Sequence, residues 1–185
     1  MKKLTIFILV GILGFSIAGC KQDKAKPVLD KNVENTDTLN AGDSTVYGTM
    51  VDGGMNSLIL VTDAGDTIEY LVNPDDTIEV VKGGKINGDK FAAVGYMEYG
   101  DRFIRKAINL TSLIGTWTSI DKNFDIKEGG AIVSHTEAER NPWTSWKIYN
   151  GKLVLSRDTF EVEELGADSL LLENKEGIFS FTRKK

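Results

Sequence analysis

From Val46 onward, short runs of β-branched and aromatic residues are separated by Gly, Asn and Asp at intervals typical of β-hairpins. No run of about ten or more residues has the apolar periodicity of an amphipathic helix. The strongest hairpin signal is Asn150-Gly151, because a two-residue type I′ turn needs positive φ at both central residues. Consecutive hairpins without crossover helices form an antiparallel meander, which closes most readily as an up-and-down barrel. The sequence therefore predicts an all-β protein.

The first of two predicted β modules covers 45–111. Its turn signals include Asp63-Ala64-Gly65-Asp66 and Asn87-Gly88-Asp89. A strand-turn-strand unit that begins Val-x-Gly, within about 65 residues, is similar in topology to OB-type barrels. The alternation along 90–96 leaves open which of its two faces points inward. Candidate strands of this module lie at 46–51, 57–62, 67–72, 76–81, 90–96 and 103–109.

The second predicted module covers 112–185 and follows the polar break Asn109-Leu110-Thr111-Ser112. Its turns are rich in Gly, and no crossover helix is expected between its strands. We therefore expect an antiparallel up-and-down meander or barrel. Its candidate strands lie at 114–118, 123–128, 131–135, 143–149, 152–156, 159–165, 169–173 and 177–183.

The N-terminus has the pattern of an export signal. Lys2-Lys3 precede an apolar core from Leu4 to Phe15, which is too short to span a bilayer stably. The ending Ile17-Ala18-Gly19-Cys20 resembles the bacterial lipobox, whose cysteine is acylated and becomes the first residue of the mature protein. This resemblance implies a signal peptide at 1–19 and attachment to the membrane through a lipid on Cys20. The alternative is a buried thiol at the end of a transmembrane anchor.

The segment 20–44 is predicted to be a flexible, lipidated tether, because it has no apolar periodicity and contains Pro27. Around Thr38 and Ser44, the triplets Asp37-Thr38-Leu39 and Asp43-Ser44-Thr45 resemble the O-glycosylation sites of Bacteroidota, so both residues are candidate sites. In a Gram-negative cell, Lys21 after the cysteine is compatible with sorting to the outer membrane. The membrane face on which the protein lies is left open.

Composition excludes one class of partner. Apolar residues make up 41% of the 185 residues, which is enough for a packed core. The formal net charge is −5, and removal of Lys2 and Lys3 with a signal peptide makes the chain more acidic. Binding to nucleic acid depends on clustered cations that displace counterions from phosphates. We therefore expect no nucleic-acid partner. Cys20 is the only cysteine, so no intrachain disulfide is possible.

Gly115-Thr116-Trp117 is similar to the Gly-x-Trp signature of lipocalins. Together with Trp146-Lys147-Ile148, the hairpin series and Phe179-Ser180-Phe181, the region 113–185 resembles the lipocalin-like lipoproteins of Bacteroidota. The resemblance implies that Trp117 plugs the narrow end of a barrel, with Gly115 allowing close approach. It also implies that Arg183 covers Trp117 in a cation–π contact. The alternative for Arg183 is a solvated terminal cation.

The module is much shorter than a typical lipocalin. Eight strands of about six residues form a shallow barrel, whose interior can be filled completely by side chains. A deep apolar cup is therefore not expected, even where the lipocalin-like signature holds.

Trp143 and Trp146 are three positions apart, so in one strand they face opposite sides. Trp146 is followed by apolar Ile148 on the same face and is the predicted core residue. Trp143, beside Pro142, is then the candidate contact for a ligand or a protein partner. The alternative is that Trp143 covers a barrel end.

No catalytic residue, metal site or cofactor is expected. His135 is the only histidine, and the adjacent Ser134 points to the opposite face of a strand. His135 also lacks the partner spacing of a zinc helix. Glu161 and Glu163 alternate with Val162 as an outward, solvated face does.

These features favour a non-catalytic binding protein of the cell envelope, attached to the outer membrane by its lipid. The ligand is a small apolar molecule at the mouth of the second barrel, or a protein across a barrel face. The alternative is a structural or protein-interaction subunit of an outer-membrane complex without a small ligand. An enzyme is the least favoured class, because no acid, base and nucleophile converge in the sequence.

Overall fold

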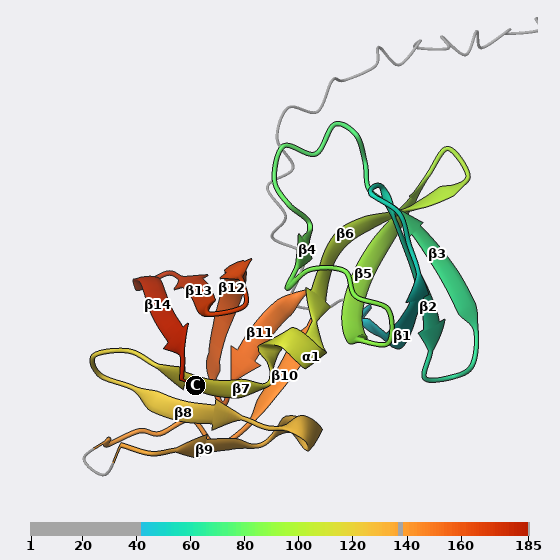
Figure 1. The fold of residues 1–185 in the computed structure, drawn as a ribbon. Helices are drawn as coiled ribbons and strands as arrows, with labels where there is room; N and C mark the ends of the chain where they lie inside the picture. The colour runs from blue at the N-terminus through green and yellow to red at the C-terminus, as the bar shows by residue number, and fades with distance from the viewer. Residues whose placement is uncertain (1–41, 137–138, 185) are drawn as a thin grey trace, which may run out of the picture. The chain divides into compact units, whose positions relative to one another are not determined.

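A computed structural model describes residues 42–136 and 139–184 (Figure 1). The described residues form two sheets joined by a four-residue helix, α1 (Leu110–Leu113), so the all-β prediction is confirmed. The proposed signal peptide at 1–19 lies outside the described residues, as do Cys20 and Thr38.

The first sheet has six strands, and five of them close into a barrel. All neighbouring strands are antiparallel except two pairs, the closing pair of β3 with β6 at Leu71 and Phe103, and the pair of β4 with β6. The order β1-β2-β3-β6-β5 around the barrel agrees with the OB-like topology predicted from the sequence. The strands are β1 (Val46–Asp52), β2 (Ser57–Thr62), β3 (Thr67–Leu71), β4 (Val81–Lys82), β5 (Lys90–Glu98) and β6 (Asp101–Asn109).

The prediction of a strand at 76–81 is wrong, because in this region only Val81 and Lys82 form a strand, β4. The alternation of Ile78 and Val80 with polar residues is typical of a strand, but a strand also needs an unpaired edge of a neighbouring strand to bond to. One edge of β6 pairs with β5. On its other edge, Phe103 already pairs with β3, so 76–82 can pair with β6 only over a short parallel stretch near Ala107. Ile78 accordingly lies in a loop and is 70% exposed.

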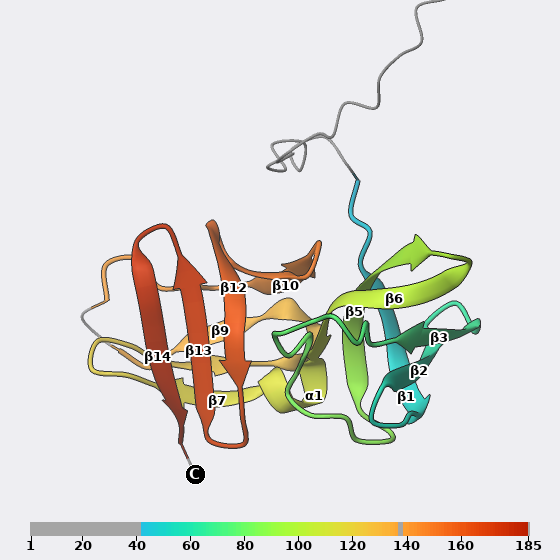
Figure 2. The same ribbon diagram turned by 90° about the horizontal axis from the view of Figure 1, so that it is seen from above.

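The second sheet has eight strands in sequential antiparallel order, and β14 returns to pair with β7 (Figure 2). Among the described residues, a single bridge links the chain beside β9 to the chain beside β10, at Ala131 and Ser145, so the barrel is nearly closed. The strand expected at 143–149 begins only at Trp146. The strands are β7 (Gly115–Thr118), β8 (Asn123–Ile126), β9 (Ile132–Ser134), β10 (Trp146–Tyr149), β11 (Lys152–Leu155), β12 (Asp158–Leu165), β13 (Ser169–Asn174) and β14 (Gly177–Arg183).

Residues 91–94 of β5 and 107–109 of β6 are buried on both faces, which explains why the sequence left the inward face of 90–96 open. Phe91, Ala93 and Ala107 pack in the core of the first barrel. Ala92 and Ile108, each one position away, pack in the core of the second barrel. Because successive residues of a strand point to opposite sides, the same two strands contribute to both cores.

Charged side chains also join the two barrels. Lys82, which is only 6% exposed, donates from Nζ to the carbonyl oxygen of Glu163 at 2.7 Å. Lys106 and Lys152 bind the two carboxylate oxygens of Glu161 at 2.5 and 2.7 Å. Burial raises the pKa of Glu161, but the hydrogen bonds and charges of the two lysines outweigh burial and lower it overall. Glu161 is thus part of a junction between barrels rather than a solvated face.

We predict that Ile108→Ala, a change within the first barrel, destabilises the second barrel as well. Loss of this fully buried side chain is expected to cost about 2–5 kcal/mol of unfolding free energy. Urea unfolding can be followed by tryptophan fluorescence, which reports on the second barrel, and by far-ultraviolet circular dichroism, which reports on both.

The two signals are expected to shift together in a single transition. Ile78→Ala, at the exposed position in the loop before β4, is the matched control and should change stability by less than about 0.5 kcal/mol. Separate transitions for the two signals, with the fluorescence midpoint unmoved, would contradict the shared core.

Candidate functional site at the mouth of the second barrel

The end of the second barrel next to α1 is closed by Trp117. Its ring is fully buried, and its Nε1 donates to the carbonyl oxygen of Leu113 at 2.9 Å. The guanidinium carbon of Arg183 lies 4.2 Å from the centre of the Trp117 ring. Arg183 also donates to the carbonyl oxygens of Ile114 and Ala167, at 2.9 and 2.7 Å. Arg183 therefore stacks on the indole and is bound to backbone, rather than solvated at the chain end.

Gly115 lies against the guanidinium of Arg183. A Cβ at this position would collide with Nη1 of Arg183, and φ is 151°, a value that side chains disfavour. The glycine of the Gly-x-Trp pattern thus leaves room for the arginine that covers the tryptophan.

We predict that Gly115→Ala lowers the unfolding free energy by more than about 1 kcal/mol, because it adds both backbone strain and a collision. Gly177→Ala is the matched control, since Gly177 has φ 137° and a Cβ added there would meet no atom within 4 Å. Urea denaturation measures both. Equal losses in the two variants would show that the Arg183 contact contributes nothing to the effect.

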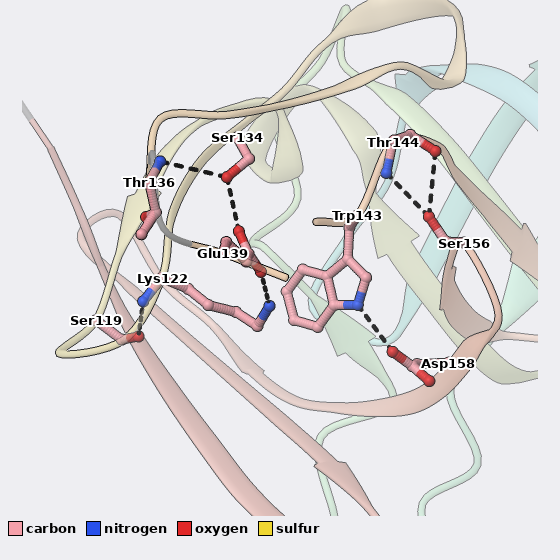
Figure 3. Close-up of polar contacts among 9 residues, drawn as sticks. All are labelled: Ser119, Lys122, Ser134, Thr136, Glu139, Trp143, Thr144, Ser156 and Asp158. Atoms are coloured by element: carbon pink, nitrogen blue, oxygen red, sulfur yellow. Dashed lines mark hydrogen bonds and ion pairs between the residues drawn. The ribbon is translucent and has the colours of Figure 1, made fainter. Parts of the chain in front are cut away.

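Trp143 fills the opposite end of the barrel, beside the β7–β8 turn that carries Lys122. Figure 3 shows its polar contacts. It is 6% exposed, and its Nε1 donates to Oδ2 of Asp158 at 2.8 Å. Its ring packs edge-to-face against Phe124 and Phe160, with centroids 5.2 and 5.7 Å apart. Lys122 Nζ lies 4.0 Å from the centre of the Trp143 ring. Trp143 therefore covers a barrel end, which was the alternative left open by the sequence.

The expected burial of the two tryptophans is reversed. Trp146 is partly exposed, and its Nε1 donates to the carbonyl oxygen of Lys127 at 2.7 Å. The prediction is wrong because it placed both residues in one strand, whereas Trp143 precedes β10. The chain before β10 crosses the barrel end, where it is held by a hydrogen bond from Thr144 N to Ser156 Oγ at 2.9 Å.

A polar cluster beside Trp143 fixes the position of Lys122. The ammonium of Lys122 forms an ion pair with Glu139, whose other oxygen accepts from Ser134 Oγ at 2.7 Å (Figure 3). Lys122 N also donates to Ser119 Oγ at 3.2 Å. Burial raises the pKa of Glu139, but hydrogen bonds from Lys122 and Ser134 and the charge of Lys122 lower it overall, below its ordinary value of 4.5. The carboxylate thus stays charged and holds Lys122 over the indole.

We predict a pH-dependent contribution of this pair to stability. Because the folded pKa of Glu139 lies below its unfolded value, the contribution is fully present above about pH 4.5 and is lost as the pH falls through the folded pKa. Urea denaturation from pH 7 to 3 is the measurement. Glu139→Gln should show a smaller loss of stability with acidification than the unmodified chain. Parallel curves for the two proteins would contradict the assignment.

A groove of about 780 Å³ opens beside this plugged end. It lies between the β7–β8 turn and β14, because β14 pairs with β7 only through Thr182 and Arg183 and the two strands then diverge. Ile178 on its rim is 64% exposed, and Ile120 is fully exposed. The groove is lined by Thr118, Ser119, Ile120, Asp121, Lys122, Ile178, Phe179, Ser180, Phe181 and Thr182.

Trp143 lies directly behind the groove. Phe181 and Lys122 both line the groove, and both contact the Trp143 ring, with Phe181 at a centroid distance of 6.3 Å. The interior beyond is filled with large apolar side chains, so a ligand has space at the mouth rather than in a deep cup. The buried interior residues include Phe124, Ile126, Ile132, Ile148, Leu153, Leu155, Phe160, Val162, Leu170 and Leu172.

His135, the histidine considered in the sequence, has an acidic partner. Nε2 of the exposed His135 lies 3.0 Å from Oδ1 of Asp125, which also accepts from Thr116 Oγ1 at 2.7 Å. Burial raises the pKa of Asp125, but these hydrogen bonds and the charges of His135 and Lys127 lower it overall. Among residues 42–136 and 139–184, no three His, Cys, Asp or Glu side chains are grouped to hold a metal.

Ser44, one of the two candidate glycosylation sites, is bonded within the fold. Its Oγ donates to Oδ1 of Asn150 at 2.7 Å, and its backbone N donates to the same oxygen at 2.9 Å. A glycan on this hydroxyl would have to remove the first of these bonds.

Across the described part of the chain, no helix has the length and apolar character needed to cross a membrane. Comparison of the sequence with family models and with curated proteins, and comparison with solved structures, found no match.

Proposed function

We propose that this chain is a non-catalytic, lipocalin-like lipoprotein of the outer membrane that binds a small apolar ligand. The attachment through Cys20 rests on the lipobox-like sequence, and the binding role rests on the groove beside β14. A groove of about 780 Å³ with aromatic walls and a few polar groups at its rim has the size and chemistry of a small-molecule site.

Several contacts support binding at the mouth rather than inside the barrel. Phe179 is partly exposed and supplies aromatic surface, Phe181 is almost fully buried in the wall behind the groove, and exposed Ile120 and Ile178 extend the apolar surface toward solvent. Lys122 is held by Glu139 and Trp143, so its ammonium is already paired where an apolar ligand would cover it. Asp121, the other charged residue of the lining, is exposed to solvent. An apolar molecule that covers the two isoleucines gains the free energy of removing their side chains from water.

A protein partner is the second candidate function, favoured by the free edge of β14. Residues 177–181 pair with β13 on one side, and within 42–136 and 139–184 no strand pairs with them on the β7 side. An exposed strand edge beside apolar side chains can accept an extended segment of another chain.

The test uses the unacylated chain from Lys21, which retains every described residue. Native mass spectrometry detects a molecule that co-purifies with the protein, and tryptophan fluorescence follows titration with palmitate, monooleoylglycerol and decanol. We expect at least one of these probes to bind and to change tryptophan emission, because Trp143 contacts two groove residues.

Ile120→Ser together with Ile178→Ser should weaken binding by about tenfold or more, because each change removes apolar contact area. Ile86→Ser, at an exposed isoleucine of the first module, is the control and should bind normally. No co-purified molecule and no response to any probe would contradict the small-ligand role. Capture of partner proteins by unmodified chain but not by the double variant would then support the second candidate.

A further inference from the structure

A second cavity, of about 390 Å³, lies where the two barrels meet. Tyr47 of β1 and Trp146 of β10 line it, together with Leu110 of α1 and Ile114 after α1. Its remaining side chains come from Asp63, Lys90, Thr111 and Glu128. The cavity thus combines aromatic and aliphatic walls with two carboxylates, one ammonium and one hydroxyl.

Hydrogen bonds hold the walls of this junction cavity in place. Tyr47 Oη donates to the carbonyl oxygen of Ile148 at 3.0 Å, and Trp146 Nε1 donates to that of Lys127 at 2.7 Å. Asp63 N donates to the carbonyl oxygen of Tyr47 at 3.1 Å. The Tyr47 bond links the first barrel to the second across the cavity. A site that is already formed loses less entropy when a ligand binds.

The same bonds determine what each wall offers to a ligand. The polar atoms of Tyr47 and Trp146 are already bonded to backbone, so these partly exposed side chains offer apolar ring surface. Asp63, Lys90 and Glu128 are exposed, and within the described residues none of their side chains has a hydrogen-bond or ion-pair partner. The rim therefore has both free acceptors and a free donor.

We propose that the junction cavity binds a neutral saccharide of one or two rings. A sugar ring has apolar C–H faces, which suit Tyr47 and Trp146, and hydroxyl groups that both donate to carboxylates and accept from an ammonium. A purely apolar ligand would leave three charged groups desolvated without partners. An organic cation would suit the carboxylates and the rings but would be repelled by Lys90.

Isothermal titration calorimetry of the unacylated chain from Lys21 tests the proposal with maltose, cellobiose, chitobiose and mannobiose, each up to about 10 mM. We expect at least one of them to bind. Trp146→Leu should weaken this binding by about tenfold or more, because a stacking surface is lost. Glu128→Ala should weaken it too, and this exposed position keeps the fold intact when the tryptophan change does not.

Ile178→Ser in the β14 groove is the control, and its saccharide binding should equal that of the unmodified chain. Tetramethylammonium chloride is the competing probe for a cation site. The proposal is overturned if no saccharide binds, if tetramethylammonium binds in their place, or if Glu128→Ala leaves saccharide binding unchanged. Failure of apolar ligands to bind at the β14 groove bears only on the function proposed above, since the two sites share no residue.

Discussion

The fold depends on two paired strand segments, 91–94 of β5 and 107–109 of β6, that are buried on both faces. Their alternate residues divide between two cores, with Phe91 and Ala93 in the first and Ala92 in the second. Position 92 must therefore be small and apolar for a reason that lies outside its own barrel. The ion pairs of Glu161 and the buried Lys82 add directional contacts around this apolar contact. The shared apolar core and these polar contacts hold the two barrels together, and the junction cavity lies beside this packed contact.

Both ends of the second barrel are closed by the same arrangement of side chains. A tryptophan fills the end, its indole N–H is satisfied, and a cation lies over the ring. At one end these are Trp117 and Arg183, and at the other Trp143 and Lys122. A short barrel has little interior to fill, so two large rings complete it. The cost is that no deep cup remains, which moves any ligand to the outside of the barrel.

The sequence predicts those features that depend on residues close together in the chain, and it misses those that depend on distant contacts. Turn residues act locally, so the all-β class and the hairpin meander of the second barrel could be predicted. The non-local pairs of the first barrel, β1 with β5 and β3 with β6, were expected only through its similarity to OB-type barrels. Gly115 and Trp117 are close together in the sequence and carry a recognisable pattern. The roles of Trp143 and Trp146 depend on where β10 begins, which alternation alone does not determine. The pairing of Tyr47 with Trp146 across a cavity depends on the contact between barrels, for which no local pattern exists.

Plugged barrel ends and a rigid junction have a consequence for how this chain could recognise other molecules. Side chains that are fixed on several sides lose little freedom on binding, so recognition here does not require the barrel to open. The apolar groove beside β14 exists because, within β14, only Thr182 and Arg183 pair with β7 among the described residues, and Arg183 is itself fixed by Trp117. The contact of Arg183 with Trp117 at one end of the barrel thus determines where β14 and β7 begin to diverge toward the opposite end. In this chain, the residues that close the barrel also shape its outer groove.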